Sequence, residues 1–189
     1  MDGKDSVGEG PAMAEIRRGR EGDIPRIAAI YDCILQDEEE GRRTVGWIRG
    51  VYPTEATARE ALAAGDLFVM AEGGTVVAAA RINRVQAPAY ADAPWRCADA
   101  PAEQVMVLHT LVVDPARGGR GYGAAFVRFY ERYALENGCP YLRMDTNAKN
   151  AAARRLYGRL GYWEAGIVPC VFNGIPDVQL VCLEKKLGD

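Results

Sequence analysis

Residues 108–126 read LHTLVVDPARGGRGYGAAF, and this stretch decides the fold. Branched and large apolar residues run up to Asp114 and Pro115, and four glycines then fall within the six positions 118–123. An amphipathic helical pattern begins directly after them. The order predicts a strand, a glycine-rich loop and a helix.

The glycine-rich loop has the features of an anion-binding site. Glycine lets the backbone approach a ligand closely, and the first N–H groups of the following helix have no acceptor within that helix. The partial positive charge of the helix N-terminus reinforces these donors, and Arg120 adds a formal charge. A plain surface turn needs only one or two glycines, so we expect a phosphate-bearing ligand here.

One alternative ligand is a nicotinamide dinucleotide. The residues Gly119-x-Gly121-x-x-Ala124 formally match its fingerprint, and Asp145 lies near the spacing of a ribose-binding carboxylate. However, residues 114–118 separate the strand from the first glycine, whereas the fingerprint normally follows its strand directly. Only about forty residues follow Asp145, too few for the second half of that fold. A dinucleotide-dependent oxidoreductase therefore remains a distant alternative.

The composition excludes several classes of protein. In 189 residues, 49% are hydrophobic and 26% are charged, as in a soluble globular domain. A net charge of −3 gives no indication of nucleic acid or an anionic membrane as partner, because both require a basic surface. No apolar run reaches membrane-spanning length and no signal peptide is evident, so we expect a cytoplasmic protein.

The cysteines predict neither disulfides nor a metal site. Five cysteines, an odd number, are widely scattered and form no C-x-x-C pair. We expect reduced thiols, most of them buried, and no bound metal.

The rest of the chain predicts one α+β domain over residues 14–189, preceded by a disordered leader over residues 1–13. Because a helix separates the strands 104–113 and 141–146, these two should be parallel, with a right-handed crossover. The expected strands are 14–18, 67–71, 75–83, 104–113, 141–146, 162–168 and 178–184. The expected helices begin at Asp23, Thr54, the glycine-rich loop and Asn150, and the expected irregular segments are 36–53, 84–103 and 169–177.

Three separated motifs resemble the GNAT superfamily of acetyl-CoA-dependent N-acetyltransferases. Ile16-Arg17 with Asp23-Ile24-Pro25 resembles its first strand and helix, and residues 111–124 resemble its pyrophosphate loop. The run Asn150-x-x-Ala153-x-x-Leu156-Tyr157-x-x-Leu160-Gly161-Tyr162 resembles its fourth-helix motif. One position departs from the family pattern: Gly118 stands where Gln or Arg is usual, and an arginine is displaced to position 117. Since main-chain N–H groups do most of the binding, we expect altered contacts rather than lost binding.

The resemblance implies a mixed, mostly antiparallel central sheet flanked by about four helices. Its parallel strand pair splays apart to admit the pantetheine arm, and main-chain groups near Leu111 and Val113 would hold that arm and polarise the thioester carbonyl. The implied coenzyme-binding residues are Leu111, Val112, Val113, Gly118, Gly119, Arg120, Gly121, Tyr122, Gly123, Ala124, Asn150 and Tyr157.

The resemblance also suggests two catalytic residues. Tyr157 would give a proton to the departing thiolate; the less favoured alternative is a core aromatic beside Leu156 and Leu160. The attacking amine must be neutral, and His109, the only histidine, could take its proton. We expect the side chain of His109 to share a face with Leu111 and Val113. A structural histidine, Glu103 or a water chain are the alternatives.

The implied activity is transfer of an acetyl group from acetyl-CoA to a primary amine of a small molecule or peptide, by direct attack without a covalent enzyme intermediate. A non-catalytic acyl-CoA sensor is the alternative. The three irregular segments flank the amine side of the cleft in this architecture. In these segments, the acidic run 37–40 could attract a cationic amine or be only a solvated face. The aromatic residues Trp47, Tyr90 and Trp95 could line a substrate pocket or fill small cores. No feature identifies the amine, and a homodimer is compatible with the chain.

Overall fold

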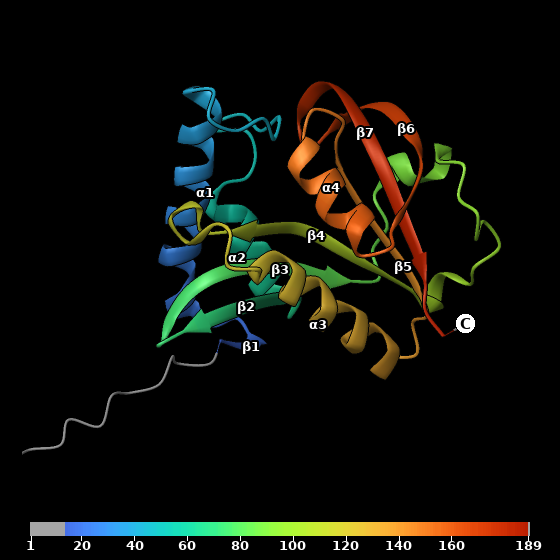
Figure 1. Ribbon diagram of the computed structural model, residues 1–189, viewed down its shortest axis with the longest axis horizontal. Coiled ribbons are helices and arrows are strands. Elements are labelled where there is room, and N and C mark those ends of the chain that lie inside the picture. The colour runs from blue at the N-terminus through green and yellow to red at the C-terminus, as the bar shows by residue number, and fades with distance from the viewer. Residues whose placement is uncertain (1–13, 189) are drawn as a thin grey trace, which may run out of the picture.

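The computed structural model describes residues 14–188, which form one mixed seven-stranded sheet in the order β1-β2-β3-β4-β5-β7-β6 (Figure 1). The strands are β1 Glu15–Arg18, β2 Leu67–Glu72, β3 Thr75–Asn83, β4 Val105–Val113, β5 Tyr141–Asn147, β6 Trp163–Phe172 and β7 Ile175–Lys186. The α-helices are α1 Ile24–Glu39, α2 Glu55–Ala63, α3 Tyr122–Glu136 and α4 Ala151–Arg159. Short 3₁₀ turns are Glu21–Asp23, Pro88–Asp92, Ala102–Gln104 and Pro115–Arg117. The predicted leader lies outside the described residues.

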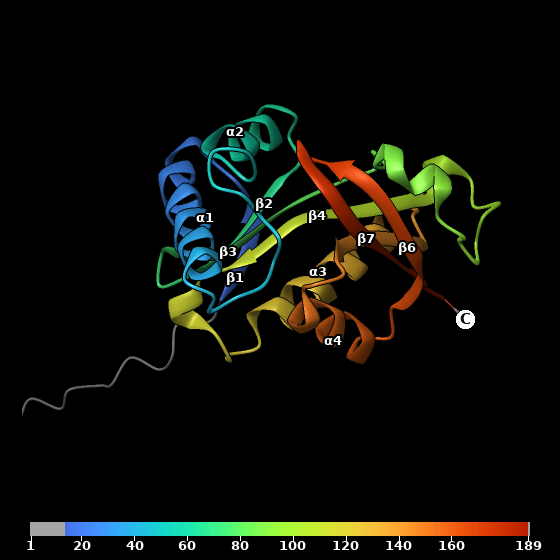
Figure 2. The same cartoon turned by 90° about the horizontal axis from the view of Figure 1, so that it is seen from above.

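The helices cover the two faces of the sheet in pairs. Viewed from above, α1 and α2 lie on one side of the strands and α3 and α4 on the other (Figure 2). Apolar residues of α1 and α2 pack on β2, β3 and the end of β4, while those of α3 and α4 pack on the opposite face. A third cluster joins the segment 84–104 to β4, β6 and β7. The sequence pattern of alternating apolar residues thus becomes three cores around one sheet.

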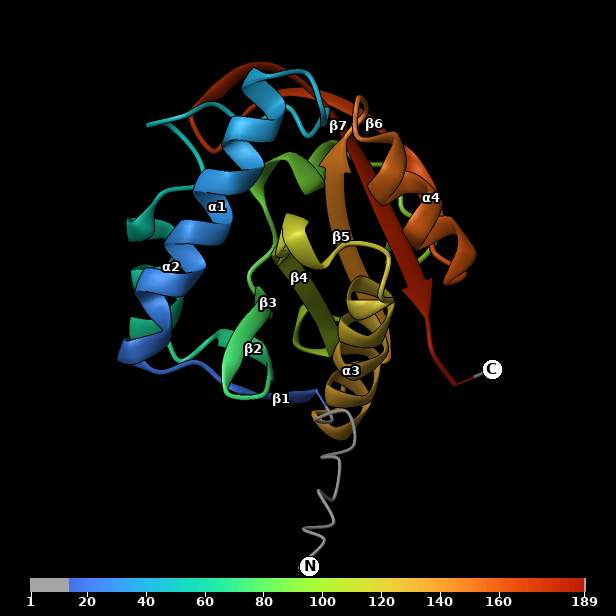
Figure 3. The same ribbon diagram turned by 60° about the vertical axis from the view of Figure 1, so that its left-hand side comes forward.

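The parallel strands β4 and β5 pair only at their beginnings. Their register runs from Val105 opposite Tyr141 to Leu108 opposite Met144 and then stops, although both strands continue. Beyond that point β5 pairs only with β7, and β4 only with β3 (Figure 3). The predicted splayed pair is confirmed, and the separation leaves backbone groups of β4 facing an opening.

A bulge in β4 reverses the side-chain alternation that we expected. Thr110 has a φ of 51°, and the register with β3 shifts between Ala79 and Arg81, so that β4 carries one extra residue there. Leu111 and Val113 consequently pack on the face of α3 and α4, with Leu108. The prediction that His109 shares their face is wrong, because the bulge falls between them.

Two element boundaries also differ from the sequence prediction. Helix α1 continues to Glu39, so the irregular segment begins four residues later than expected. The predicted loop 169–177 is a tight hairpin turn at Asn173 and Gly174, with β6 and β7 extended up to it. Both turn residues have positive φ, the conformation for which an Asn-Gly pair is well suited.

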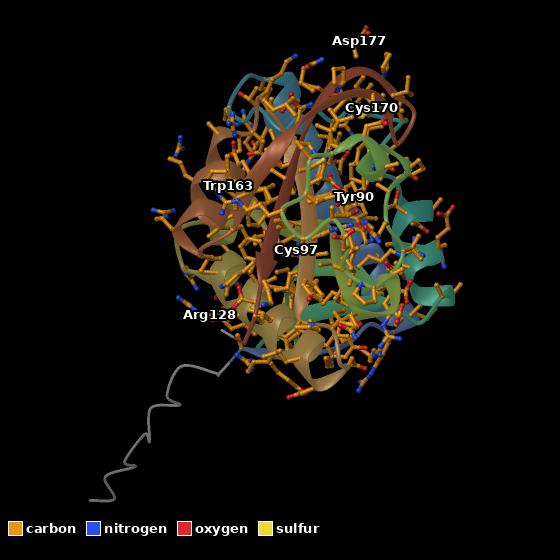
Figure 4. All side chains as sticks on the ribbon, turned by 90° about the vertical axis from the view of Figure 1, so that its right-hand side faces the viewer. Tyr90, Cys97, Arg128, Trp163, Cys170 and Asp177 are labelled. Carbon is orange, nitrogen blue, oxygen red and sulfur yellow. The ribbon has the colours of Figure 1, made fainter. Side chains whose placement is uncertain are left out.

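The segment 84–104 is long but closely held against the sheet (Figure 4, where Tyr90 and Cys97 are labelled on it). The buried Arg143 of β5 donates to the carbonyl oxygen of Cys97 at 2.9 Å and lies over the ring of Trp95 at 4.3 Å. The carboxylate of Glu184 in β7 accepts from the backbone N–H of Arg96 at 2.5 Å. Buried charges are stable only when they are bonded in this way, and these bonds fix the segment in place.

Candidate active site

A cleft of about 720 Å³ opens where β4 and β5 separate. The end of β4, the glycine-rich loop and helix α4 line one part of it. The segment 43–52, the end of β5 and the β6–β7 hairpin line the other part. We call these parts the coenzyme half and the acceptor half, after the roles that the family resemblance predicts for them. Every residue that the sequence assigned to coenzyme binding lines the cleft: Leu111, Val112, Val113, Gly118, Gly119, Arg120, Gly121, Tyr122, Gly123, Ala124, Asn150 and Tyr157.

The glycine-rich loop presents unpaired donors to the coenzyme half. Gly119 and Gly121 have φ values of 77° and 79°, a backbone conformation that side chains disfavour. Helix α3 begins at Tyr122, and the N–H groups of residues 119–124 donate to no group in the described part of the chain. A row of free N–H groups at the start of a 15-residue helix is a suitable receptor for a diphosphate.

Glu72, at the end of β2, organises the charged residues of this loop. Its carboxylate accepts from Arg117 and from the hydroxyl of Tyr122, each at 2.7 Å, and lies 3.6 Å from Arg120. Arg117, displaced from the usual family position, is therefore held beside the loop by an ion pair. Arg120 is more than half exposed and is available to an anion.

Asn150 and Tyr157 come to the coenzyme half on helix α4. The side-chain oxygen of Asn150 accepts from the backbone N–H of Ala153 at 3.1 Å, so Asn150 is the helix N-cap, and it also lines the cleft. Tyr157 is 7% exposed and packs against Tyr162. Burial, and secondly the nearby charge of Asp145, raise the pKa of Tyr157, which keeps its phenol protonated.

In the acceptor half, the acidic run 37–40 shapes the wall rather than exposing free carboxylates. Asp37 binds Arg42 and Arg43, each at 2.8 Å. Glu38 accepts from the backbone N–H groups of Val45 and Gly46 at 2.5 and 3.1 Å, and Glu39 pairs with Arg49. These bonds fold the segment 42–49 over the cleft.

Of the three aromatic residues that the sequence singled out, only Trp47 lines the cleft. It meets Tyr52 edge to face, with ring centroids 5.9 Å apart, and the hydroxyl of Tyr52 is hydrogen-bonded to that of Thr110. Tyr90 and Trp95 instead fill the third core, where Trp95 Nε1 donates to the carbonyl oxygen of Tyr90 at 2.8 Å.

Asp145 is the feature of the acceptor half that the sequence analysis did not assign to it. The residue lies on β5 just after the pairing with β4 has ended, and it lines the cleft. Its Oδ2 accepts from the hydroxyl of Tyr90 at 2.7 Å. Burial raises the pKa of Asp145 to about 6. An acid at the end of an apolar strand, where parallel strands part, is the sequence signal that could have identified it.

Neither candidate base from the sequence lines the cleft. The Nε2 atom of His109 lies 2.9 Å from Oδ1 of Asn83, on the other face of the sheet from Leu111. Burial, and secondly the charge of Arg81, lower the pKa of His109 to about 4, so its ring is neutral at physiological pH. Glu103 is exposed in a 3₁₀ turn before β4. The base role of either residue stays a prediction.

Residues 14–188 show neither a metal cluster nor a membrane-spanning helix. Among them, no group of three or more His, Cys, Asp and Glu side chains is arranged to hold a metal ion. No helix in this part of the chain combines the length and the apolar character needed to cross a membrane.

Known structures share this architecture at low sequence identity. A GNAT-family acetyltransferase from Streptococcus agalactiae is 19% identical, with a TM-score of 0.77 and coverage of 93% of this chain and 96% of that one. A putative acetyltransferase from Salmonella typhimurium, solved with its cofactor acetyl-CoA, is 18% identical, with a TM-score of 0.67 and coverage of 93% and 95%. A ribosomal-protein-alanine N-acetyltransferase from Brucella melitensis is 20% identical, with a TM-score of 0.68 and coverage of 92% and 99%.

Sequence comparison gives the family directly. No curated protein matches the chain. The model of the acetyltransferase (GNAT) family matches residues 29–162, well over half of the sequence, and this match includes the glycine-rich loop and helix α4. The chain belongs to the GNAT family of acetyltransferases.

Proposed function

We propose that the protein transfers the acetyl group of acetyl-CoA to a primary amine by direct attack of the amine on the thioester. The observation that carries the proposal is the opening between β4 and β5, with free N–H donors at one end and Tyr157 in its wall. This arrangement allows a long thioester to lie along the unpaired edge of β4.

The residues of the coenzyme half fit coenzyme A. The free N–H groups of residues 119–124 and the helix N-terminus would hold the diphosphate, and Arg120 would add charge. A Cβ atom on Gly123 would lie 3.2 Å from Cδ2 of Leu156, so glycine leaves room where α3 and α4 meet. The backbone of Leu111 and Val113 would hold the pantetheine arm and polarise the carbonyl.

Tyr157 would supply the proton that the leaving sulfur needs. Its raised pKa keeps the proton on the phenol until the carbon–sulfur bond breaks. Because a buried phenolate is disfavoured, this proton must be replaced at once. The amine nitrogen, which loses a proton as the new carbon–nitrogen bond forms, can supply the replacement.

Two assays test the proposal. Coenzyme A and acetyl-CoA should raise the melting temperature, because they bind only the native state, whereas NAD and NADP should leave it unchanged. Free thiol should then appear when acetyl-CoA is mixed with a panel of primary amines. Stabilisation by acetyl-CoA without thiol release from any amine would favour an acyl-CoA sensor, and stabilisation by NAD alone would overturn the proposal.

A further inference from the structure

The cleft holds one carboxylate without a cation. Among the Asp, Glu and His residues of the described chain, only Asp114 and Asp145 line it. Asp114 is paired with Arg26 and accepts from the backbone N–H of Ala116 at 3.0 Å. Asp145 has the hydroxyl of Tyr90 as its hydrogen-bond partner and no cationic partner within residues 14–188. Its other oxygen is free to receive a donor.

The groups that face Asp145 are all neutral acids. They come from every element packed around it: Tyr90 from the 84–104 segment, Tyr157 from α4, Tyr52 from the 42–54 segment, Cys170 from β6 and Cys182 from β7. The charge of Asp145 contributes to raising the pKa of each of them, although burial is the larger cause. Two cations act on these neighbours, Arg81 on Tyr52 and Arg143 on Cys182, but Arg81 is paired with Asp66 and Arg143 donates to the carbonyl oxygen of Cys97. Neither is paired with Asp145, so a ligand cation would be favoured there.

Apolar side chains surround this single charge. The apolar and aromatic residues that line the acceptor half are Ile34, Val45, Trp47, Tyr52, Phe172, Ile175, Val178 and Leu180, and Thr110, Thr146 and Asn147 add neutral polar groups. The guanidinium of Arg43, the one arginine in this half, is already bound to Asp37. The site therefore offers one carboxylate, a few neutral polar groups and a mainly apolar, partly aromatic wall. It offers no unpaired cation that could bind an acidic group of a substrate.

We propose that Asp145, oriented by Tyr90, binds the ammonium group of a primary monoamine with an aromatic or aliphatic body and then takes one of its protons. This inference rests on the proposed acetyl transfer and names its acceptor class and base. Asp145 and Tyr157 reach the cleft from different elements, β5 and α4, so the acceptor nitrogen can lie between the base and the leaving sulfur.

The protons balance in this scheme. The ammonium gives one proton to Asp145, and the neutral amine forms a bond to the carbonyl carbon as the carbon–sulfur bond breaks. Tyr157 gives its proton to the sulfur, and the second nitrogen proton restores Tyr157. Asp145 then loses its proton to solvent, so the net products are an N-acetylamine, coenzyme A and one proton.

The first experiment compares Asp145→Asn with Asp92→Asn, a control that removes an exposed carboxylate from the segment that carries Tyr90. With phenethylamine and acetyl-CoA near neutral pH, Asp145→Asn should lower kcat/KM about 100-fold or more. The loss should shrink at alkaline pH, where free amine is abundant. The affinity for coenzyme A, measured by titration calorimetry, should change less than about twofold, and Asp92→Asn should behave as wild type. Unchanged kcat/KM in Asp145→Asn would overturn the inference.

The second experiment does not depend on turnover. Calorimetric titration of phenethylamine into the complex with coenzyme A should show binding to the wild type and at least about tenfold weaker binding to Asp145→Asn. Spermidine, with several charges, and phenylalanine, with a carboxylate, should bind the wild type more weakly than phenethylamine. Equal binding to both variants, or preference for spermidine or phenylalanine, would contradict the proposed acceptor class. Absence of thiol release with every amine would instead refute the acetyl transfer.

The third experiment tests Tyr90 as a positioning residue. Its hydrogen bond lowers the pKa of Asp145 against the effect of burial. Tyr90→Phe should therefore move the acidic limb of the kcat/KM profile to higher pH, by up to about one unit, and Asp145→Asn should abolish this limb. An acidic limb that is identical in wild type, Tyr90→Phe and Asp145→Asn would show that another group titrates.

Discussion

The two halves of the cleft are built in different ways. The coenzyme half consists mainly of backbone: free N–H groups of residues 119–124 and the unpaired edge of β4, with two side chains from α4. The acceptor half consists of side chains from segments far apart in the sequence, which meet only after folding. A backbone site accepts a chemistry common to a whole family, whereas a side-chain site can change its ligand with a few substitutions.

The largest expected effect separates chemistry from binding within the coenzyme half. Tyr157→Phe removes the proton for the leaving sulfur but preserves the ring that packs against Tyr162. Steady-state kinetics should show kcat reduced about 100-fold or more, with KM for acetyl-CoA changed less than about twofold. Unchanged kcat would remove Tyr157 from catalysis and leave it a core residue.

The pH dependence of stability compares His109 with Asp145. The folded-state pKa of His109 is lowered to about 4 from 6.5, so the unfolded chain binds more protons and stability falls as pH drops through this window. The folded-state pKa of Asp145 is raised to about 6 from 3.8, so the folded chain binds more protons than the unfolded chain in this window. Its ionised form therefore destabilises the fold above pH 6, and its protonation stabilises the fold as the pH falls below 6.

Urea unfolding of single variants near pH 7 and pH 5 measures both effects. From pH 7 to pH 5, the free energy of unfolding should fall by about 2 kcal/mol less in His109→Gln than in the wild type. In Asp145→Asn it should fall by about 1 kcal/mol more, because the variant lacks the stabilisation that Asp145 gains on protonation. Asp145→Asn should also be the more stable protein near pH 7, as expected for a residue kept for function. Identical pH dependence in all three proteins would show that neither group is perturbed by folding.

Glycine conformation tests the backbone character of the coenzyme half. Gly121→Val places a branched side chain at a φ of 79°, so the loop must rearrange. We expect about tenfold weaker coenzyme A binding by calorimetry, equivalent to about 1–2 kcal/mol of strain.

Gly138→Val is the matched control, because Gly138 has a φ of 72° at the far end of α3 and also has open space around it. It should lower stability by a similar amount and leave the affinity for coenzyme A unchanged. Equal affinities in the two variants would contradict the role of the loop.

The smallest effect concerns the wall of the acceptor half. Glu38→Gln removes the charge of the side chain that accepts from the N–H groups of Val45 and Gly46. The segment 42–49 should therefore be held less firmly against the cleft. KM for phenethylamine should rise about threefold with little change in kcat, whereas Glu40→Gln, at an exposed ion pair, should have no effect. Equal KM values in both variants would show that this segment does not shape the acceptor site.

The difference between the halves also explains what could be predicted from sequence. The strand, glycine-rich loop and helix are consecutive, so residues 108–126 were enough to predict the loop and the helix start. The parallel pairing of β4 and β5 was predicted because a helix lies between them in the sequence. The separation of these two strands was predicted from the family resemblance. Asn150 was predicted to bind the coenzyme, with a helix N-cap as the compatible alternative; the structure shows the N-cap bond, and the coenzyme contact stays a prediction.

The remaining features depend on contacts between distant residues. The bulge at Thr110 has no glycine to mark it, and it moved His109 to the other face. The bond from Tyr90 to Asp145 joins residues 55 positions apart, and no local pattern indicates that these two residues will meet. The Asn173-Gly174 turn, by contrast, carried a local signal that the sequence analysis did not use.

A crystal structure of the complex with coenzyme A and phenethylamine tests the central claim most directly. We predict the diphosphate within hydrogen-bond distance of the N–H groups of residues 119–124, the sulfur beside the hydroxyl of Tyr157, and the amine nitrogen beside Asp145. A diphosphate bound elsewhere, with the opening between β4 and β5 left to solvent, would contradict the account.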